Sequence, residues 1–416
     1  MPLQLISVLG LLVFVALAWA CSLNRKSFPW RTVAWGLGLQ FLFALLILHT
    51  HFGRATFELA RRGVNRLISF SDEGSRMVFG PLANAQLLTD KWGPENSFIF
   101  VITVSATIIV VSALSSLLYH WGILQVVVRG AAWVMRRAMR TSGSESLAAA
   151  ANIFMGQTEA PLVIKPYLNG MTRSELLALM TGGMATIAGG VLAAYVAFGV
   201  DAGHLLTASV MSAPASLMIA KIMLPESESS ETASGTTAVI PRETSNGLDA
   251  LCRGAGDGAL LAINVMAMLI AFVAVVALAN YLFGLVQRGA GLDQPVTLQT
   301  VFGWINAPFA WIMGVPSRDC LLVGQVMGER IVLNEFIGYL SLTNMQKQTL
   351  LDPRSFTLAT YALCGFANFS SIAIQIGGIG ALAPKRRADL ASLGLRAMIG
   401  GVLASYLTAT VVGILT

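Results

Sequence analysis

The stretch ANIFMGQTEAPLVI, residues 151–164, places a glutamine, a threonine and a glutamate inside an otherwise apolar run. Gly156 and Pro161, residues of two types that break helices, stand on either side of the Gln-Thr-Glu sequence at 157–159. If this run lies in a membrane, a charge there costs at least about 2.5–3.5 kcal/mol on insertion scales. The glutamate therefore needs either a function or a partner.

The whole chain has the composition of a membrane protein. Hydrophobic residues make up 55% of the 416, charged residues only 12%, and the mean hydropathy is +0.71. A membrane-spanning helix needs about 20 apolar residues, so the long uncharged stretches predict an all-α polytopic membrane protein with about eight spans. These stretches are 1–24, 32–53, 96–128, 176–200, 202–220, 258–287, 355–384 and 397–416.

The first apolar run lacks a basic segment before it, which favours a retained span over a cleaved signal peptide. The net charge of +6 needs no nucleic acid, because basic loops facing anionic lipid explain it. The partner that this composition predicts is the lipid bilayer.

Basic residues predict the orientation, because they concentrate in cytoplasmic loops. The segment NRKSFPWR at 24–31 follows the first span, and PKRRADL at 384–390 precedes the last. Both termini are therefore expected to face outward. The cluster RGAAWVMRRAMR at 129–140 is also expected inside, as an amphipathic interfacial helix. RATFELARRGVNRL at 54–67 has the spacing of an interfacial helix too, but the span count puts its four arginines outside, against the rule.

Residues 225–247, rich in Ser, Thr, Glu and Gly, predict a flexible cytoplasmic linker between two halves that resemble each other. Each half contains an interrupted apolar segment, then a Gly-rich span, then a plain span. Paired broken segments of this kind indicate a transporter's binding site. In the first half they are 156–161, 182–190 and 202–220, and in the second 332–336, 364–380 and 397–416.

Each interrupted segment is too short to cross a bilayer twice, so it predicts a re-entrant hairpin. The first is expected to enter from the cytoplasm and the second from outside, which makes an inverted repeat. The domains expected are 1–128, scaffold spans 1–3 with an interfacial helix; 129–222, the first transport repeat; 223–250, the linker; 251–290, scaffold span 6; and 291–416, the second transport repeat.

The turn of the first hairpin would present Gln157, Thr158 and Glu159 to a polar ligand, since irregular backbone at membrane depth occurs only where it is buried or lines a wet cavity. The alternative is a structural pair between Glu159 and Lys165. Glu335, with Asn334 beside it, is the second such acid. Its structural alternative is stronger, because the neighbouring residues 329 and 330 are also charged.

Two further polar groups have both functional and structural interpretations. In CGFANFSS at 364–371, Asn368 and Ser371 either bind a ligand or hydrogen-bond between packed helices. In GGMATIAGG at 182–190, the glycines either allow close packing or mark a broken span, whose free carbonyls and Thr186 hydroxyl could hold an ion.

Neither enzyme nor redox chemistry is predicted. There is no HExxH, GxSxG or phosphate-binding P-loop, so we expect no catalytic residue, no cofactor and no ATP-driven pump. The cysteines lie far apart without a CxxC spacing, which favours small core residues, and the histidines lie near span ends. The cysteines are Cys21, Cys252, Cys320 and Cys364, and the histidines are His49, His51, His120 and His204.

At these motifs the chain resembles the concentrative nucleoside transporters, over nearly its whole length. The family pattern G-x-K-x3-N-E-F-V-A-Y is matched at Gly328, Asn334, Glu335, Phe336 and Tyr339. It departs at Arg330 for Lys, Ile337 for Val and Gly338 for Ala. GQTEAP, CGFANFSSIA and GALAPKRR (380–387) also resemble bacterial members, and the absence of extra N-terminal spans fits the short form with eight spans and two hairpins.

The resemblance implies a homotrimer in which each protomer has a static scaffold and a transport domain that moves like an elevator. It implies that a carboxylate accepts ribose hydroxyls, which are good donors to it. The residues it assigns to the nucleobase are Gln157, Thr158, Glu159, Val191 and Leu261. Those it assigns to the ribose are Glu335, Asn368 and Ser371, with Phe366 packing nearby.

The family's sodium site maps onto Asn152, the Met155 carbonyl, Thr186 and the Ile187 carbonyl. A sodium-driven bacterial member has serine in place of Thr186, so the hydroxyl remains and sodium is expected, with proton coupling as the alternative. The implied function is a symporter that imports nucleosides such as uridine, with the preference between purine and pyrimidine left open.

Two other functions remain at this point. A symporter for another small polar solute, such as an amino acid, would be expected to present a base to the carboxylate, whereas the hairpin tips carry acids. A non-transporting membrane scaffold would use the polar residues only to hold helices together.

Overall fold

The computed structural model describes residues 2–93, 99–233, 244–289 and 296–416. Within these ranges the regular structure is helical, with no strand, and seven helices are long and apolar enough to cross a membrane. The predicted all-α polytopic fold is confirmed. Residues 234–243, in the middle of the predicted linker, lie outside the described part.

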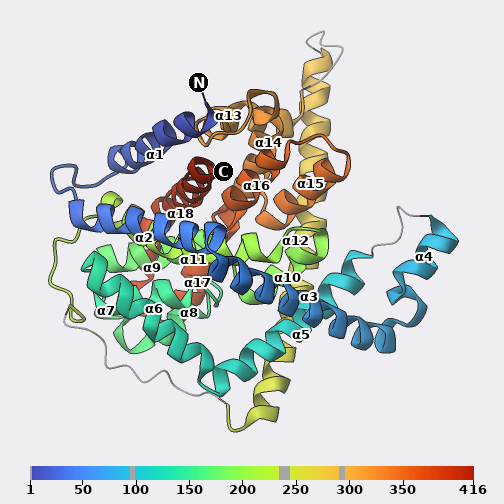
Figure 1. The fold of residues 1–416 in the computed structure, drawn as a ribbon, viewed down its shortest axis with the longest axis horizontal. Helices are drawn as coiled ribbons and strands as arrows, with labels where there is room; N and C mark the ends of the chain where they lie inside the picture. The colour runs from blue at the N-terminus through green and yellow to red at the C-terminus, as the bar shows by residue number, and fades with distance from the viewer. Residues whose placement is uncertain (1, 94–98, 234–243, 290–295) are drawn as a thin grey trace.

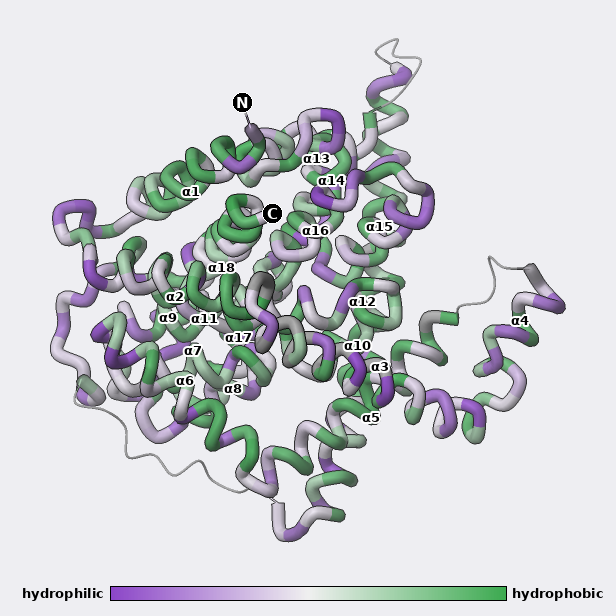
Figure 2. The backbone as a smooth tube through the Cα atoms, viewed as in Figure 1, coloured by the Kyte–Doolittle hydropathy of each residue, from purple (hydrophilic) through white to green (hydrophobic). Residues whose placement is uncertain are grey.

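The helices before the first hairpin include the first three predicted spans, α1, α2 and α5. Helix α3 contains the predicted interfacial segment 54–67, and α6 contains most of 129–140. Figure 2 shows hydrophilic residues on α3 and α4, which extend away from the rest of the molecule in Figure 1. The elements are α1 (Leu3–Ala20), α2 (Trp30–His49), α3 (His51–Phe79), η1 (Gly80–Ala83), α4 (Ala85–Trp92), α5 (Phe100–His120) and α6 (Ile123–Met139).

The first repeat contains a short helical hairpin and a broken span, as predicted. The span breaks between Ala185 and Gly189. Capping boxes define the starts of α7 and α9, because the side chains of Ser142 and Thr172 each accept a hydrogen bond from the backbone NH of the glutamate three residues later. The elements are α7 (Gly143–Ala151), α8 (Ala160–Val163), η3 (Lys165–Tyr167), α9 (Arg173–Ala185), α10 (Gly189–Phe198) and α11 (Ala202–Met223).

The second repeat has the same order of elements. Helices α14 and α15 meet at residues 333–334 as the second hairpin, and the predicted span 355–384 is two helices, α16 and α17, neither of which is among the seven candidate spans. The elements after the linker are α12 (Gly247–Gly289), α13 (Leu298–Ile312), η4 (Ser317–Asp319), α14 (Cys320–Val332), α15 (Glu335–Lys347), α16 (Pro353–Leu363), α17 (Phe369–Leu382), η5 (Pro384–Arg386) and α18 (Arg387–Leu415).

Both ends of the predicted linker, 223–250, are more ordered than a flexible segment. Helix α12 begins at Gly247, because the Asn246 side chain accepts a hydrogen bond from the Asp249 backbone NH at 2.9 Å. At the other end, the buried Thr232 accepts a 2.9 Å hydrogen bond through its carbonyl from the backbone NH of Gly143, the first residue of α7. The first part of the linker is thus attached to the first hairpin.

A buried ion pair lies beside that attachment. Lys221, near the end of α11, lies 2.7 Å from a carboxylate oxygen of Glu145 and 3.2 Å from one of Glu226. Ser230 donates a hydrogen bond to Glu175 at 2.5 Å. Residues 226–232 therefore form a strap across the starts of α7 and α9.

The two hairpins lie at opposite sides of the molecule, α7 and α8 below and α14 and α15 above in Figure 1, while α12 runs between these levels. The two broken spans touch at their breaks. Gly365, with φ +130°, lies so close to α9 that a Cβ atom there would be 2.6 Å from the Met184 carbonyl oxygen and 2.9 Å from that of Ala185. This arrangement agrees with an inverted repeat whose two broken spans meet at their breaks.

We expect Gly365→Ala to destabilise the protein, because the positive φ and the contact with the Met184 carbonyl both oppose a side chain. Each effect is worth about 1–3 kcal/mol. Thermal unfolding in detergent measures it. Gly377→Ala on α17 is the control, since a Cβ atom there meets nothing within 4 Å. Equal melting temperatures for the two variants would contradict this account of the crossing.

Candidate functional site

The tip of the first hairpin is held by its own backbone. The Gly156 NH donates to the Glu159 carboxylate at 3.1 Å, and the Gly156 carbonyl accepts from the backbone NH groups of residues 159 and 160, each at 3.0 Å. No ion pair joins Glu159 to Lys165 in the described chain, so Lys165 is not the structural partner of this acid there. The carboxylate instead faces an open cavity.

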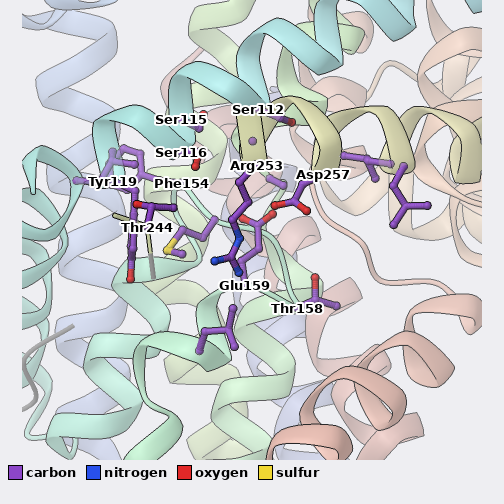
Figure 3. Close-up of a pocket in the computed structure, with 18 of the residues that line it drawn as sticks. Ser112, Ser115, Ser116, Tyr119, Phe154, Thr158, Glu159, Thr244, Arg253 and Asp257 are labelled. Atoms are coloured by element: carbon purple, nitrogen blue, oxygen red, sulfur yellow. The ribbon is translucent and has the colours of Figure 1, made fainter. Parts of the chain in front are cut away.

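The cavity has a volume of about 450 Å³ and lies between the first hairpin and the helices α5 and α12. That size lies within the range of small-molecule sites, about 300–1,000 Å³. Figure 3 shows Glu159 from the hairpin and Arg253 and Asp257 from α12 pointing into the same part of it. Thr158 and Leu261 also line it, and α5 contributes hydroxyls from Ser112, Ser115 and Ser116.

Glu335 begins α15 and is almost fully buried, with 3% of its surface exposed. One carboxylate oxygen accepts a hydrogen bond from the Tyr195 hydroxyl at 3.1 Å, and the other accepts from the Asn368 amide at 3.0 Å. The Asn368 amide oxygen in turn accepts from the Ser371 NH at 2.9 Å and so caps α17. The acid is thus surrounded by polar partners from both repeats.

Gln157 connects the first hairpin to this cluster. Its amide nitrogen donates to the Ser371 hydroxyl at 3.1 Å, and its amide oxygen accepts from Gln375 at 3.1 Å. Gln375, fully buried on α17, also donates to the Met180 carbonyl at 3.0 Å. The tip of one hairpin therefore contacts the broken helix of the other repeat.

The nine residues predicted to bind one ligand fall into two neighbouring groups. Thr158, Glu159 and Leu261 line the cavity, while Gln157 and the Glu335–Asn368–Ser371 cluster are linked by hydrogen bonds, the last three all buried. Of the remaining two, Val191 is buried next to the cavity-lining Gly190, and Phe366 is half-buried in the break before Asn368.

The four residues predicted to hold an ion flank the end of α7 and the break of α9. Asn152 is 1% exposed, and neither its amide oxygen nor its amide nitrogen has a hydrogen-bond partner among the described residues. The Thr186 hydroxyl donates to the Gly182 carbonyl at 2.9 Å. The Met155 and Ile187 carbonyls accept no hydrogen bond from the described part of the chain.

This donor set fits a hard monovalent cation. Buried polar atoms are nearly always satisfied, so the amide of Asn152 calls for a partner that the described residues do not supply. Amide, hydroxyl and carbonyl oxygens are ligands that hard cations prefer. Among the described residues there is no group of three or more His, Cys, Asp or Glu side chains that could hold a metal, so a carboxylate-rich divalent site does not fit.

Sequence analysis missed three residues of the site. Tyr195 and Gln375 were not among the predicted residues, and Arg330 was noted only as a charged neighbour of Glu335 and as a departure from a family pattern. Arg330 is fully buried and donates to the Ala362 carbonyl at 2.6 Å, to the Gly365 carbonyl at 3.3 Å and to a hydroxyl on α18 at 3.2 Å. A polar side chain inside an apolar span is itself a signal of function, and Gln375 carries that signal.

Comparisons with known proteins find matching family models along most of the chain. Residues 204–413 and 9–82 match the family models described as the C-terminus and the N-terminus of Na+ dependent nucleoside transporters, and residues 101–202 match a gate model described as nucleoside recognition. An uncharacterized transporter of Haemophilus influenzae is 42% identical over 412 residues, 98% of this chain and 97% of its own.

Two further matches are a sodium/nucleoside cotransporter and a solved structure. Sodium/nucleoside cotransporter 1 of Rattus norvegicus is 40% identical over 429 residues, which cover 100% of this chain and 64% of the rat protein. This chain thus spans less than two thirds of that relative. The structure of CNTnw in an inward-facing substrate-bound state matches with a TM-score of 0.94 and 37% identity, over 99% of this chain and 97% of that one.

We expect Tyr195→Phe to lower stability, because it removes a hydrogen bond to the buried carboxylate of Glu335. Hydrogen bonds to charged groups contribute about 1.5–3 kcal/mol. Thermal unfolding in detergent measures the loss. Tyr281→Phe on the exposed surface of α12 is the matched control and should unfold like the unchanged protein. If both variants melt at the same temperature, the Tyr195 hydroxyl does not support the acid.

Proposed function

The chain belongs to the family of Na+ dependent nucleoside transporters, and we propose that it imports nucleosides across a bacterial inner membrane by symport with sodium. One arrangement carries the proposal. The tip of the first hairpin has a cavity of about 450 Å³ on one side, and the helix that leads into it ends at Asn152, whose buried amide has no described partner. Substrate and ion would therefore bind on the same short hairpin.

The cluster around Glu335 would bind the ribose. Each carboxylate oxygen has more than one lone pair, so it can accept a ribose hydroxyl in addition to the bond from Tyr195 or Asn368. A site built to pair hydroxyls rejects analogues that lack them. Ser371 would contribute its hydroxyl once Gln157 turns from it towards the substrate.

The nucleobase would occupy the neighbouring cavity. Thr158 and Glu159 offer a hydroxyl and a carboxylate to its polar edge, and Leu261 offers an apolar surface from α12. Val191 and Phe366 would pack against the same ligand from the two broken spans. The hairpin wall of this cavity belongs to the proposed transport domain, 129–222 and 291–416, and the α5 and α12 wall belongs to the proposed scaffold.

Sodium would close the first hairpin against the broken span. Asn152, Thr186 and the carbonyls of Met155 and Ile187 would hold the ion, which supplies positive charge between backbone segments that lack donors there. Its binding would order the hairpin that carries the base-binding residues. Because binding is reciprocal under linkage, sodium should tighten nucleoside binding and nucleoside should tighten sodium binding by the same factor.

Alternating access would follow from movement of the transport domain past a static scaffold, within a homotrimer. A wall shared by two domains supports this, because displacement of one domain opens or closes the cavity. The exposed apolar side chains of α12, such as Ile270 and Val286, suit lipid or a neighbouring protomer. The termini would lie on the periplasmic side.

The symporter for another polar solute is less well supported. A buried arginine does lie near Glu335, but it is fully buried and three of its five N–H donors are taken by the carbonyls of Gly365 and Ala362 and by a serine hydroxyl. Radiolabelled uridine uptake into vesicles separates the candidates. Sodium-driven accumulation supports the proposal, uptake that tracks pH alone assigns coupling to protons, and no uptake under either gradient favours a scaffold protein.

We expect Glu335→Gln to abolish measurable uridine uptake in a protein that still folds and inserts. Disrupting a buried, hydrogen-bonded charge costs about 2–5 kcal/mol, or roughly 30- to 3,000-fold in affinity. Uridine uptake and the uridine Kd give the measurement. Glu329→Gln, at another buried acid of the second hairpin, is the control and should leave both nearly unchanged. Near-normal affinity in Glu335→Gln rejects the ribose assignment.

We expect Asn152→Leu to weaken the sodium dependence of uridine binding without removing a ribose contact, because it deletes one of the proposed ion ligands. The uridine Kd is measured in detergent with sodium or choline as the only cation. Asn344→Leu, at an exposed residue of α15, is the control. A sodium effect as large in Asn152→Leu as in the unchanged protein would contradict the assignment of the ion to this site.

A further inference from the structure

Arg330 is the largest fully buried side chain of the described protein. It lies in the last turn of α14 and forms no ion pair with any described carboxylate. Its guanidinium instead donates to the carbonyls of Ala362 and Gly365 and to the Ser405 hydroxyl. A buried charge held mainly by backbone carbonyls needs a reason, because its desolvation is costly.

The carbonyls it binds are those left without partners where α16 stops. Helix α16 ends at Leu363, and the last carbonyls of a helix have no intrahelical donors and carry partial negative charge. Ser405 completes the set, since its hydroxyl donates to the Cys364 carbonyl at 2.8 Å. Arg330 and Ser405 thus satisfy the carbonyls of Ala362, Cys364 and Gly365, while the Tyr339 hydroxyl donates to the Thr360 carbonyl at 2.9 Å.

The first repeat has an equivalent place, filled differently. Asn152 directly follows the last residue of α7, and Arg330 lies two residues before the last residue of α14, so both stand at the end of the first helix of a hairpin and near the broken span of their own repeat. A Cβ atom on Gly182 of α9 would lie 3.1 Å from the Asn152 amide nitrogen. The two amide atoms of Asn152 have no hydrogen-bond partner among the described residues, whereas in the second repeat the Arg330 guanidinium donates to backbone carbonyls.

We propose that Arg330 is a built-in cation that does permanently for the second hairpin what the coupling ion does for the first: it fixes α14 to the break between α16 and α17. This rests on the proposed function, in which an ion closes the first hairpin. Only one of the two equivalent places then needs a cation from solution.

Arg330 is accordingly a positioning residue for the ribose site. Glu335 follows it by five residues, and Asn368 follows Gly365 by three. The 3.0 Å hydrogen bond between Asn368 and Glu335 joins the same two segments a second time. Fixing the segments at Arg330 therefore sets the separation of the two side chains that would share the ribose.

The test compares Arg330→Lys, which keeps a cation, with Arg330→Gln, which keeps hydrogen bonding without charge. We expect Lys to hold sodium-dependent uridine affinity within about 10-fold and Gln to lose about 30-fold or more. Arg318→Gln, at an arginine on η4 whose side chain is 71% exposed, is the control for charge loss on the same repeat and should change neither.

Chemical rescue separates a cation site from a purely structural role. In Arg330→Ala, added methylguanidinium should raise the melting temperature saturably and increase uridine affinity at least about 10-fold. In the unchanged protein it should change neither the melting temperature nor the uridine affinity. The melting readout needs no nucleoside. It therefore still decides the role of Arg330 if the unchanged protein fails to bind uridine, a result that would count against the proposed function alone.

Either of two results overturns the inference. One is an Arg330→Gln protein that binds uridine like the unchanged protein, since charge is then unnecessary. The other is an Arg330→Lys protein as damaged as Arg330→Gln, together with no melting response to methylguanidinium in Arg330→Ala, since the side chain then acts through its shape. If Arg330→Ala is not recovered folded, the comparison of Lys with Gln decides.

Discussion

Two apolar spans of this protein are broken, and the site depends on how the free helix ends at the two breaks are satisfied. Hydrocarbon offers no hydrogen bonds, so each exposed NH and carbonyl at a break must find a partner inside the protein. The breaks meet at Gly365, where the backbone lies against the end of α9. Asn368 caps the helix that follows one break, and a guanidinium caps the helix before it.

The need to satisfy these helix ends also determines where the polar side chains of the site lie. Side chains that satisfy a break are polar, buried and held in fixed directions, which is what recognition of a small polar ligand requires. Glu335 and Asn368 lie at the starts of helices α15 and α17, and their hydrogen bond links the second hairpin to the second broken span. Gln157 reaches the same place from the first hairpin. The crossing of the repeats thus brings together polar groups from the two hairpins and the two broken spans.

The sequence predicted the broken segments, because Gly156 and Pro161 flank the polar tip of the first hairpin and glycines lie on both sides of the break at 186–188. It could not predict which polar groups meet. Tyr195 and Glu335 are 140 residues apart, and Gln157 and Gln375 are 218 apart. Such contacts depend on how the halves cross, which no local pattern encodes. The early start of α12 and the strap at 226–232 were missed for a related reason, since a Ser- and Glu-rich composition hides specific caps and ion pairs.

The strap also has a mechanical consequence. Because Thr232 is bonded to the start of α7, the chain between the first hairpin and α12 is effectively tethered at residue 232 and not at the end of α11. From Thr232 to Gly247 the chain has 247 − 232 = 15 residue steps. At about 3.3–3.6 Å per residue, their contour length is roughly 50 Å, which exceeds the thickness of a bilayer's hydrocarbon core, about 30 Å. The chain from Thr232 to Gly247 therefore sets an upper limit of roughly 50 Å on the distance between the start of α7, to which Thr232 is bonded, and the start of α12.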